Sequence, residues 1–215
     1  GGGIYNFGTL TLTGSAVSGN TANYGVGGGI YNYEDKKLTL TNSTVSGNTA
    51  NYGGGIFNDD RGTLTLTGST VSGNTANTSG GGIYNSSWST LTLTNSTVSG
   101  NTAKYGGGVY VESGTVNLSF STLTLNQATS AGGGIYIHSG TVKLKGVILG
   151  GNTSQSGSGP ECSGSLTSQG YNLIKSNADC GFTAQTTDIL NQDPALGALA
   201  NNGGPTQTHL PQAGS

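Results

Sequence analysis

The sequence has little charge and no long hydrophobic segment. Only 7% of its 215 residues are charged, and the formal net charge is -2. A nucleic-acid-binding face needs clustered Lys and Arg side chains, so this composition predicts no nucleic-acid partner. The longest apolar runs, such as Val147-Ile148-Leu149, are only a few residues long, whereas a membrane-spanning helix needs about 20. We therefore expect no membrane insertion.

Methionine is absent and cysteine is scarce. The chain has two cysteines, Cys162 and Cys180, both in its C-terminal part. A disulfide between them would close a loop of about 18 residues, contribute about 3 kcal/mol and indicate an oxidising compartment. Two unpaired thiols are the alternative, because spacing alone does not establish a bridge. No initiator Met or signal segment precedes the first residues, so we expect a processed product or a fragment.

What the sequence has in abundance is a glycine-marked repeat. The motif Gly-Gly-Gly-(Ile/Val)-(Tyr/Phe) recurs in steps of 26 or 27 residues, beginning at Gly1, Gly27, Gly53, Gly80, Gly106 and Gly132. Each period contains three short segments with strand alternation, separated by turn residues, and no run with helical spacing. At about 3.3 Å per strand residue, one period traces at most about 85 Å, which suits a single three-sided coil.

The periodicity predicts the fold class. Apolar residues at matching positions of successive periods, such as Leu38, Leu64 and Leu91, would stack in inward-facing columns. We expect an all-β chain that forms a right-handed parallel β-helix, a three-sided solenoid of six rungs of about 26 residues with a disulfide-closed C-terminal segment. Residues 1–157 would hold the repeats, and residues 158–215 would form a C-terminal capping or partial-rung segment.

An Asn follows the third strand segment of every period. These residues are Asn20, Asn48, Asn74, Asn101, Asn126 and Asn152. Stacked corner amides can bond to the backbone and to one another, so we interpret this set as a structural ladder.

Aromatic residues alternate with the inward Ile and Val of the first segment, so they should face outward. They are Tyr5, Tyr31, Phe57, Tyr84, Tyr110 and Tyr136. Such a column could stack on sugar rings or pack against a neighbouring molecule. Alternatively, it stabilises its own strands through neighbour contacts. We regard it as a candidate interaction face.

One group of charged residues is a candidate for chemistry. Glu34 and Asp35 fall one period before Asp59 and Asp60, close to Arg61. Such a cluster could bind Ca²⁺ or, with Arg61 as base, act on an acidic sugar. The favoured interpretation is a variable turn with compensating cations. We predict no catalytic residue, metal site or cofactor.

The two histidines give no sign of a metal site. His138 and His209 are far apart in the sequence, and neither has a Cys or acidic partner at a metal-ligand spacing. We expect surface or packing roles for both.

Threonine dominates the outward positions of the second segment. Thr63, Thr65 and Thr67 are one set, and the resulting array resembles the face of β-solenoid ice-binding proteins. Threonine is also a common choice at a solvated strand position, and the array ends in Lys143 and Lys145.

Two resemblances cover almost the whole chain. The pairing of Gly-Gly-Gly-Ile with Val-Ser-Gly-Asn in the first four periods resembles the GGAI and FxxN repeats of the polymorphic outer-membrane proteins, which are surface adhesins. The C-terminal motifs look like the end of bacterial choice-of-anchor Q β-helix proteins; they are Cys162-Ser163-Gly164-Ser165-Leu166, Gly170-Tyr171-Asn172-Leu173-Ile174, Asp193-Pro194-Ala195-Leu196-Gly197 and Asn202-Gly203-Gly204-Pro205-Thr206. These resemblances imply a secreted or surface-anchored bacterial protein, and they imply no catalytic residues.

We therefore expect a non-enzymatic extracellular structural protein, serving as a stalk, an adhesive module or a filament subunit. The first repeat begins at Gly1, so the backbone N–H and C=O groups of the first rung would be unpaired on one side. This favours head-to-tail stacking of copies; a fragment whose cap is missing is the alternative. The expected partners are other copies end to end and a glycan or cell-surface ligand. A polysaccharide-binding or polysaccharide-cleaving protein and an ice-binding protein are the alternatives.

Overall fold

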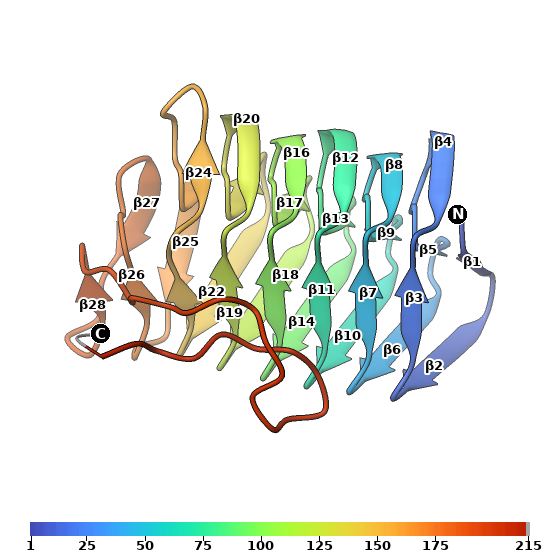
Figure 1. Cartoon of the computed structure of the whole chain (residues 1–215). Helices are drawn as coiled ribbons and strands as arrows, with labels where there is room; N and C mark the ends of the chain where they lie inside the picture. The colour runs from blue at the N-terminus through green and yellow to red at the C-terminus, as the bar shows by residue number, and fades with distance from the viewer. Residues whose placement is uncertain (214–215) are drawn as a thin grey trace.

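The computed structural model describes residues 1–213 as a β-solenoid with no helix in that range (Figure 1). Gly214 and Ser215, the last residues of the predicted C-terminal segment, lie outside the described residues. Each solenoid strand pairs in parallel with the strand one turn further on, and Leu64 stands opposite Leu91. This register confirms the predicted all-β, parallel β-helical architecture, in which like side chains stack along one axis.

Two strand columns are joined at the C-terminal end in a 14-stranded sheet. The first column contains β1 (Ile4–Asn6), β5 (Ile30–Asn32), β9 (Ile56–Asn58), β13 (Ile83–Asn85), β17 (Val109–Val111) and β21 (Ile135–Ile137). The second contains β2 (Thr9–Thr13), β6 (Lys37–Thr41), β10 (Thr63–Thr67), β14 (Thr90–Thr94), β18 (Thr115–Ser119) and β22 (Thr141–Lys145).

The third column starts an eight-stranded sheet of its own, called here the third-column sheet. It contains β3 (Ala16–Ser18), β7 (Thr44–Ser46), β11 (Thr70–Ser72), β15 (Thr97–Ser99), β19 (Thr122–Thr124) and β23 (Ile148–Leu149). These three columns correspond to the three strand segments that the sequence predicted in each period.

The structure adds a fourth strand to each turn, which the sequence did not predict. This column is a six-stranded sheet of β4 (Thr21–Val26), β8 (Thr49–Tyr52), β12 (Thr75–Ser79), β16 (Thr102–Tyr105), β20 (Gln127–Ala131) and β24 (Thr153–Ser154). Its inward residue is alanine, and Ala50, Ala76, Ala103 and Ala128 are almost completely buried. With this column each turn has four strands, which are distributed over three sheets.

The C-terminal strands continue the same sheets to about seven turns. They are β25 (Cys162–Ser168), β26 (Leu173–Ile174), β27 (Cys180–Thr183) and β28 (Ile189–Leu190). Strand β25 spans a corner, because it pairs with both β21 and β22. The six-stranded sheet has no strand after β24 in the described residues, so the last turns lack the fourth strand.

The two cysteines form a disulfide, as predicted. Cys162 in β25 and Cys180 in β27 have Cα atoms 5.4 Å apart, and their strands are paired neighbours. The bridge therefore fastens one turn to the next at the C-terminal end. A disulfide of this kind persists in an oxidising environment, which indicates a location outside the cytoplasm.

A single apolar core fills the solenoid from end to end. In the third turn its members are Ile56, Leu64, Leu66 and Val71, all fully buried. Burying four such side chains contributes about 6 to 12 kcal/mol per turn. Ordering the backbone of a whole turn costs more than this at about 1 kcal/mol or more per residue, so the turns stabilise one another and fold together.

The glycine triplet is required by the corner before the first column. Gly53 has φ 59°, a left-handed conformation that favours glycine. At Gly55 an added Cβ would lie 2.6 Å from the carbonyl oxygen of Gly82 and 3.0 Å from Nδ2 of Asn74, which is too close for a side chain. The third glycine of the triplet thus makes room for the Asn of the same turn.

Candidate functional surfaces

The predicted Asn residues form a continuous hydrogen-bonded ladder. From Asn20 to Asn152, each Nδ2 donates to the Oδ1 of the Asn in the next turn at 2.9 Å. The same Oδ1 accepts the backbone N–H of the preceding Asn, as Asn74 does from Asn48 at 3.0 Å. Nδ2 of Asn74 also donates to the carbonyl of Val45. Because these contacts use the amide on both sides, the ladder holds turns together and leaves little for a ligand.

A buried carboxylate ends this ladder. Glu161 Oε2 accepts from Nδ2 of Asn152 at 2.6 Å, and its Oε1 accepts from the backbone N–H of Gly151 at 2.9 Å. Burial raises the pKa of Glu161 against the opposing effect of these bonds. Cys162 pairs with Ile135, so Glu161 takes the place of a third triplet glycine. Sequence reasoning missed this role, although the change from Gly-Gly-Ile to Pro-Glu-Cys marks it.

A second Asn ladder lies at the end of the first column. Nδ2 of Asn6, Asn32 and Asn58 donates to Oδ1 of the Asn one turn on, at 2.7, 2.8 and 2.9 Å, and the ladder ends at Asn85. Val111 occupies the same position in the following turn. The repeated Ile-Tyr-Asn and Ile-Phe-Asn motif was the available signal for this ladder.

Serine forms a third polar column, at the corner between the second and third columns. The backbone N–H of each Ser donates to the Oγ of the Ser in the next turn at 3.1 to 3.2 Å. The members are Ser15, Ser43, Ser69, Ser96 and Ser121. Each of the three polar columns therefore repeats a side-chain bond along the axis of the solenoid.

The predicted aromatic face is a continuous stack of rings, here called the aromatic column. Ring centroids are 4.7 Å apart for Phe57 and Tyr84, 4.8 Å for Tyr84 and Tyr110, and 5.4 Å for Tyr110 and Tyr136, with nearly parallel planes. Tyr84 is only 8% exposed. Since the rings cover one another's faces, this part of the column presents ring edges and hydroxyl groups outward.

The aromatic column changes geometry towards the N-terminus and has flanking rings. Tyr31 meets both Tyr5 and Phe57 edge to face, at 5.0 and 5.6 Å. From the neighbouring six-stranded sheet, Tyr52 and Tyr105 approach the column at 5.7 Å from Tyr84 and 5.2 Å from Tyr136. The aromatic surface is therefore wider than the six residues that the sequence indicated.

The charged residues of the predicted cluster lie close together, but Arg61 is already paired with two of the carboxylates. Arg61 Nε donates to Oδ1 of Asp35 at 2.8 Å, and its terminal nitrogen lies 3.6 Å from Oδ2 of Asp60. Asp59 instead accepts a 2.5 Å bond from the hydroxyl of Tyr31. Burial and this carboxylate raise the pKa of Tyr31. In the described part of the chain, no group of three or more His, Cys, Asp or Glu side chains could hold a metal ion.

The threonine face is a regular array on the second column. Thr63, Thr65 and Thr67 stand opposite the matching threonines of β14 without a shift in register. The register continues through β18 into β22, where Lys143 and Lys145 take two of the three positions. The threonine rows therefore stay in register from turn to turn, but they are limited to the first turns.

A C-terminal tail, residues 191–213, covers the outer face of the third-column sheet (Figure 1). After β28 it runs back along the solenoid and turns near β11, where Thr206 Oγ1 donates to the carbonyl of Gly68 at 2.9 Å. Thr70 Oγ1 in β11 donates to the carbonyl of Gln207 at 2.8 Å. Thr70 in β11 and both Thr97 and Ser99 in β15 are buried on this face. Sequence analysis gave no indication of this cover.

The histidines have separate, non-metal environments. His209 in the tail is buried, with Nε2 2.8 Å from Oγ of Ser99 and Nδ1 2.7 Å from the carbonyl of Gly197. Because a carbonyl only accepts, Nδ1 carries the proton in this arrangement. His138 follows β21 and is exposed. His209 thus fastens the tail to the sheet.

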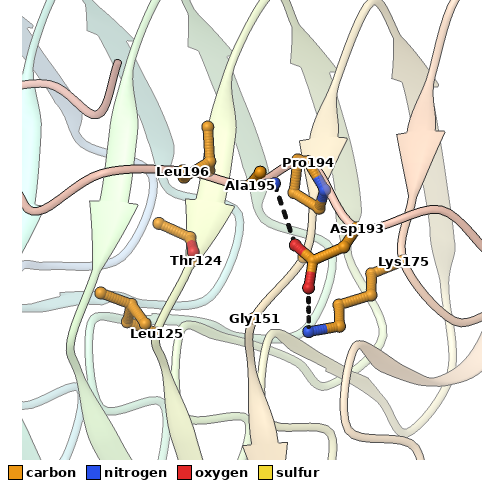
Figure 2. A pocket seen from close by; sticks show the side chains of 9 residues that line it. Thr124, Leu125, Gly151, Lys175, Asp193, Pro194, Ala195 and Leu196 are labelled. Carbon is orange, nitrogen blue, oxygen red and sulfur yellow. Dashed lines mark hydrogen bonds and ion pairs between the residues drawn. The ribbon is translucent and has the colours of Figure 1, made fainter. Parts of the chain in front are cut away.

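A cleft of about 330 Å³ lies where the tail leaves the solenoid (Figure 2). On one side Lys175 Nζ pairs with Oδ2 of Asp193 at 2.6 Å, and on the other Leu125 faces the tail residues Pro194 and Leu196. The cleft is open, and its two charged groups neutralise each other. It therefore marks the root of the tail.

Parallel strands stacked in three sheets around one apolar core define a β-solenoid protein. Residues 1–125, more than half of the chain, match the model of the family described as "Right handed beta helix region". The chain therefore belongs to the right-handed β-helix family. The comparisons found no match among curated proteins or solved structures. Residues 1–213 contain no helix that could cross a membrane.

Proposed function

We propose that this chain is a non-enzymatic structural protein of the cell surface or extracellular space, serving as a rigid stalk or adhesive module. One observation carries the proposal: three polar columns and the aromatic column link successive turns outside the backbone ladder. Such columns fix each turn against the next and favour one stiff body. The disulfide and the resemblance of the C-terminal motifs to choice-of-anchor Q proteins support an exported, bacterial origin.

The test compares binding with turnover on a panel of cell-surface and uronic-acid polysaccharides. We expect the folded chain to retain a polysaccharide or a cell surface without releasing sugar products. Release of product by the parent chain, lost in Arg61→Ala but retained in Lys104→Ala, would contradict the proposal and favour a polysaccharide-cleaving enzyme. Arg61 is the informative position because two carboxylates flank it.

For an adhesive module, the aromatic surface is the favoured contact face. The ring faces of Tyr84 and Tyr110 are occupied by each other, so glycan contact would use ring edges, hydroxyl groups and the flanking Tyr52 and Tyr105. Tyr105→Ala should therefore weaken retention at unchanged thermal stability. Equal retention by parent and Tyr105→Ala would remove this face from the proposal.

Copies of the stalk would associate end to end, continuing the parallel sheets from one molecule into the next. Negative-stain microscopy at high concentration should show rods that are multiples of one length. Monodisperse short rods would rule out the filament form.

Ice binding is the second candidate, favoured by the in-register threonine array on β10 and β14. It predicts thermal hysteresis that Thr65→Lys removes and Thr141→Lys leaves unchanged, since Thr141 lies beside Lys143 outside the regular array. A parent chain without thermal hysteresis excludes this candidate.

A further inference from the structure

Three tyrosines gather near the C-terminal end of the aromatic column. Tyr136 lies 5.4 Å from Tyr110, with ring planes only 8° apart, and 5.2 Å from Tyr105 at a tilt of 54°. Tyr110 and Tyr136 are opposite one another in paired strands, and both are partly exposed. The fold therefore holds two accessible phenol rings in near-parallel contact.

Held this way, two phenols are prepared for oxidative coupling. Each loses one electron and one proton to give a phenoxyl radical, and the two radicals join through carbons ortho to the hydroxyl groups. One C–C bond forms, and the hydrogen on each joined carbon then moves to oxygen as a proton and restores both phenols. The net change is the loss of two C–H hydrogens, and hydrogen peroxide accepts the two electrons and two protons to give two waters. Because the two strands are paired, each ring meets the other at a high effective concentration. Coupling within the chain should therefore compete well with coupling between chains.

We propose that Tyr110 and Tyr136 are an oxidative modification site, at which a one-electron peroxidase and hydrogen peroxide form a dityrosine cross-link between adjacent turns. What distinguishes this pair is near-parallel stacking combined with partial exposure of both rings. Tyr84 is nearly buried, and Tyr24 is 95% exposed with no aromatic ring against it among the described residues. Tyr5 lies 5.0 Å from Tyr31 and 5.7 Å from Tyr33, but these ring planes are inclined at 82° and 36°.

The surroundings of Tyr110 affect how its proton leaves. Burial, followed by the neighbouring Tyr136 and Glu112, raises the pKa of Tyr110 to about 12. The phenol is therefore protonated at neutral pH, and oxidation must transfer a proton together with the electron. The Glu112 carboxylate is a nearby group able to accept it.

The test treats the full-length chain with a haem peroxidase and hydrogen peroxide, then denatures it and cleaves after Lys and Glu. The expected product joins peptide 105–112 to peptide 113–143 with the loss of two hydrogens. Tyr136→Phe should abolish it, Tyr110→Phe should reduce it at least tenfold, and Tyr105→Phe should leave it in place. Cross-linked protein should also melt at a higher temperature than untreated protein.

Three outcomes would overturn the proposal. The first is no joined peptide under conditions that oxidise free tyrosine. The second is a product that survives Tyr110→Phe but not Tyr105→Phe, which would assign the bond to the tilted pair. The third is equal coupling in the urea-unfolded chain, or mixed-isotope products when labelled and unlabelled chains are combined, because either shows that stacking within the chain is not responsible.

Discussion

At the scale of single residues, the corners of the solenoid contain both strained backbone conformations and stabilising side-chain hydrogen bonds. Phe120 has φ 49° and is 60% exposed, at a corner where Asn42 and Asn95 have the same left-handed conformation and Gly146 also has positive φ. A bulky residue in this region is costly, by about 1 to 2 kcal/mol. Asn tolerates it better because its short polar side chain bonds locally.

Phe120→Asn should therefore raise the free energy of unfolding, by about 1 kcal/mol. Asn95→Phe is the matched control and should lower it by a similar amount. Urea denaturation measures both. A loss of stability in Phe120→Asn would mean that the contact of its ring with the Gly146 backbone outweighs the strain.

The Asn ladder is the other residue-scale feature that mutation can test. Asn74→Ala removes the acceptor for Asn48 and the donor to Val45, all buried. Each buried group left unsatisfied costs about 1 to 3 kcal/mol, so we expect a loss of several kcal/mol. Asn77→Ala breaks an exposed amide pair with Asn51 and should change stability by less than about 0.5 kcal/mol. Equal effects would contradict a stabilising ladder.

At the scale of elements, the tail is a separate unit held mainly by polar contacts. Of its residues only Pro194 and His209 are buried. Lys175, followed by the backbone N–H of Ala195, holds the pKa of Asp193 below its ordinary value of 3.8. A carboxylate with a lowered pKa stabilises the folded state above its ordinary value, and this contribution disappears as the pH falls through the lowered pKa.

Acidification below about pH 4 should therefore loosen the root of the tail while the solenoid stays folded. Hydrogen exchange at Ala195 and its neighbours should increase first, with little change in β9 to β15. Asp193→Asn should lack the acid-dependent step at the root of the tail. Simultaneous exchange of tail and solenoid would show that they unfold as one unit.

Particular elements show what the sequence could and could not predict. Leu64, Leu66 and Val71 recur with the period of the turn, so the inward columns follow directly from the pattern. The fourth strand was missed because its buried residue is a small alanine, which gives little hydrophobic signal. The tail was missed because it lies outside the repeat and docks through single bonds such as that of Thr70.

The candidate sites were predicted in position but not in detail. Alternation placed Tyr84 and Tyr110 outside the core, yet ring orientation depends on side-chain torsions, and the observed stacking covers the ring faces on which a sugar ring could have stacked. Sequence neighbours suggested one acidic cluster. The structure divides it, because Asp59 bonds to Tyr31 while Asp35 and Asp60 flank Arg61.

At the scale of the whole molecule, the disulfide acts at one end. Cys162 and Cys180 fasten β25 to β27, and the chain-entropy account gives a loop of this size about 3 kcal/mol. Reduction should therefore open the last turns while β5 to β13 keep their protection, as measured by hydrogen exchange with and without reductant. Loss of protection along the full length on reduction would contradict a local role.

The Glu161 carboxylate gives the Asn ladder a built-in stop. From Asn48 to Asn152 each amide both donates and accepts a bond along the ladder, so a duplicated turn with its own glycine triplet and Asn fits anywhere in that stretch. A carboxylate only accepts and has nothing to offer a further amide. Unequal crossing-over within the gene can thus lengthen the rod by about 4.8 Å per copied turn, and the Asn ladder of every variant would still end at this carboxylate.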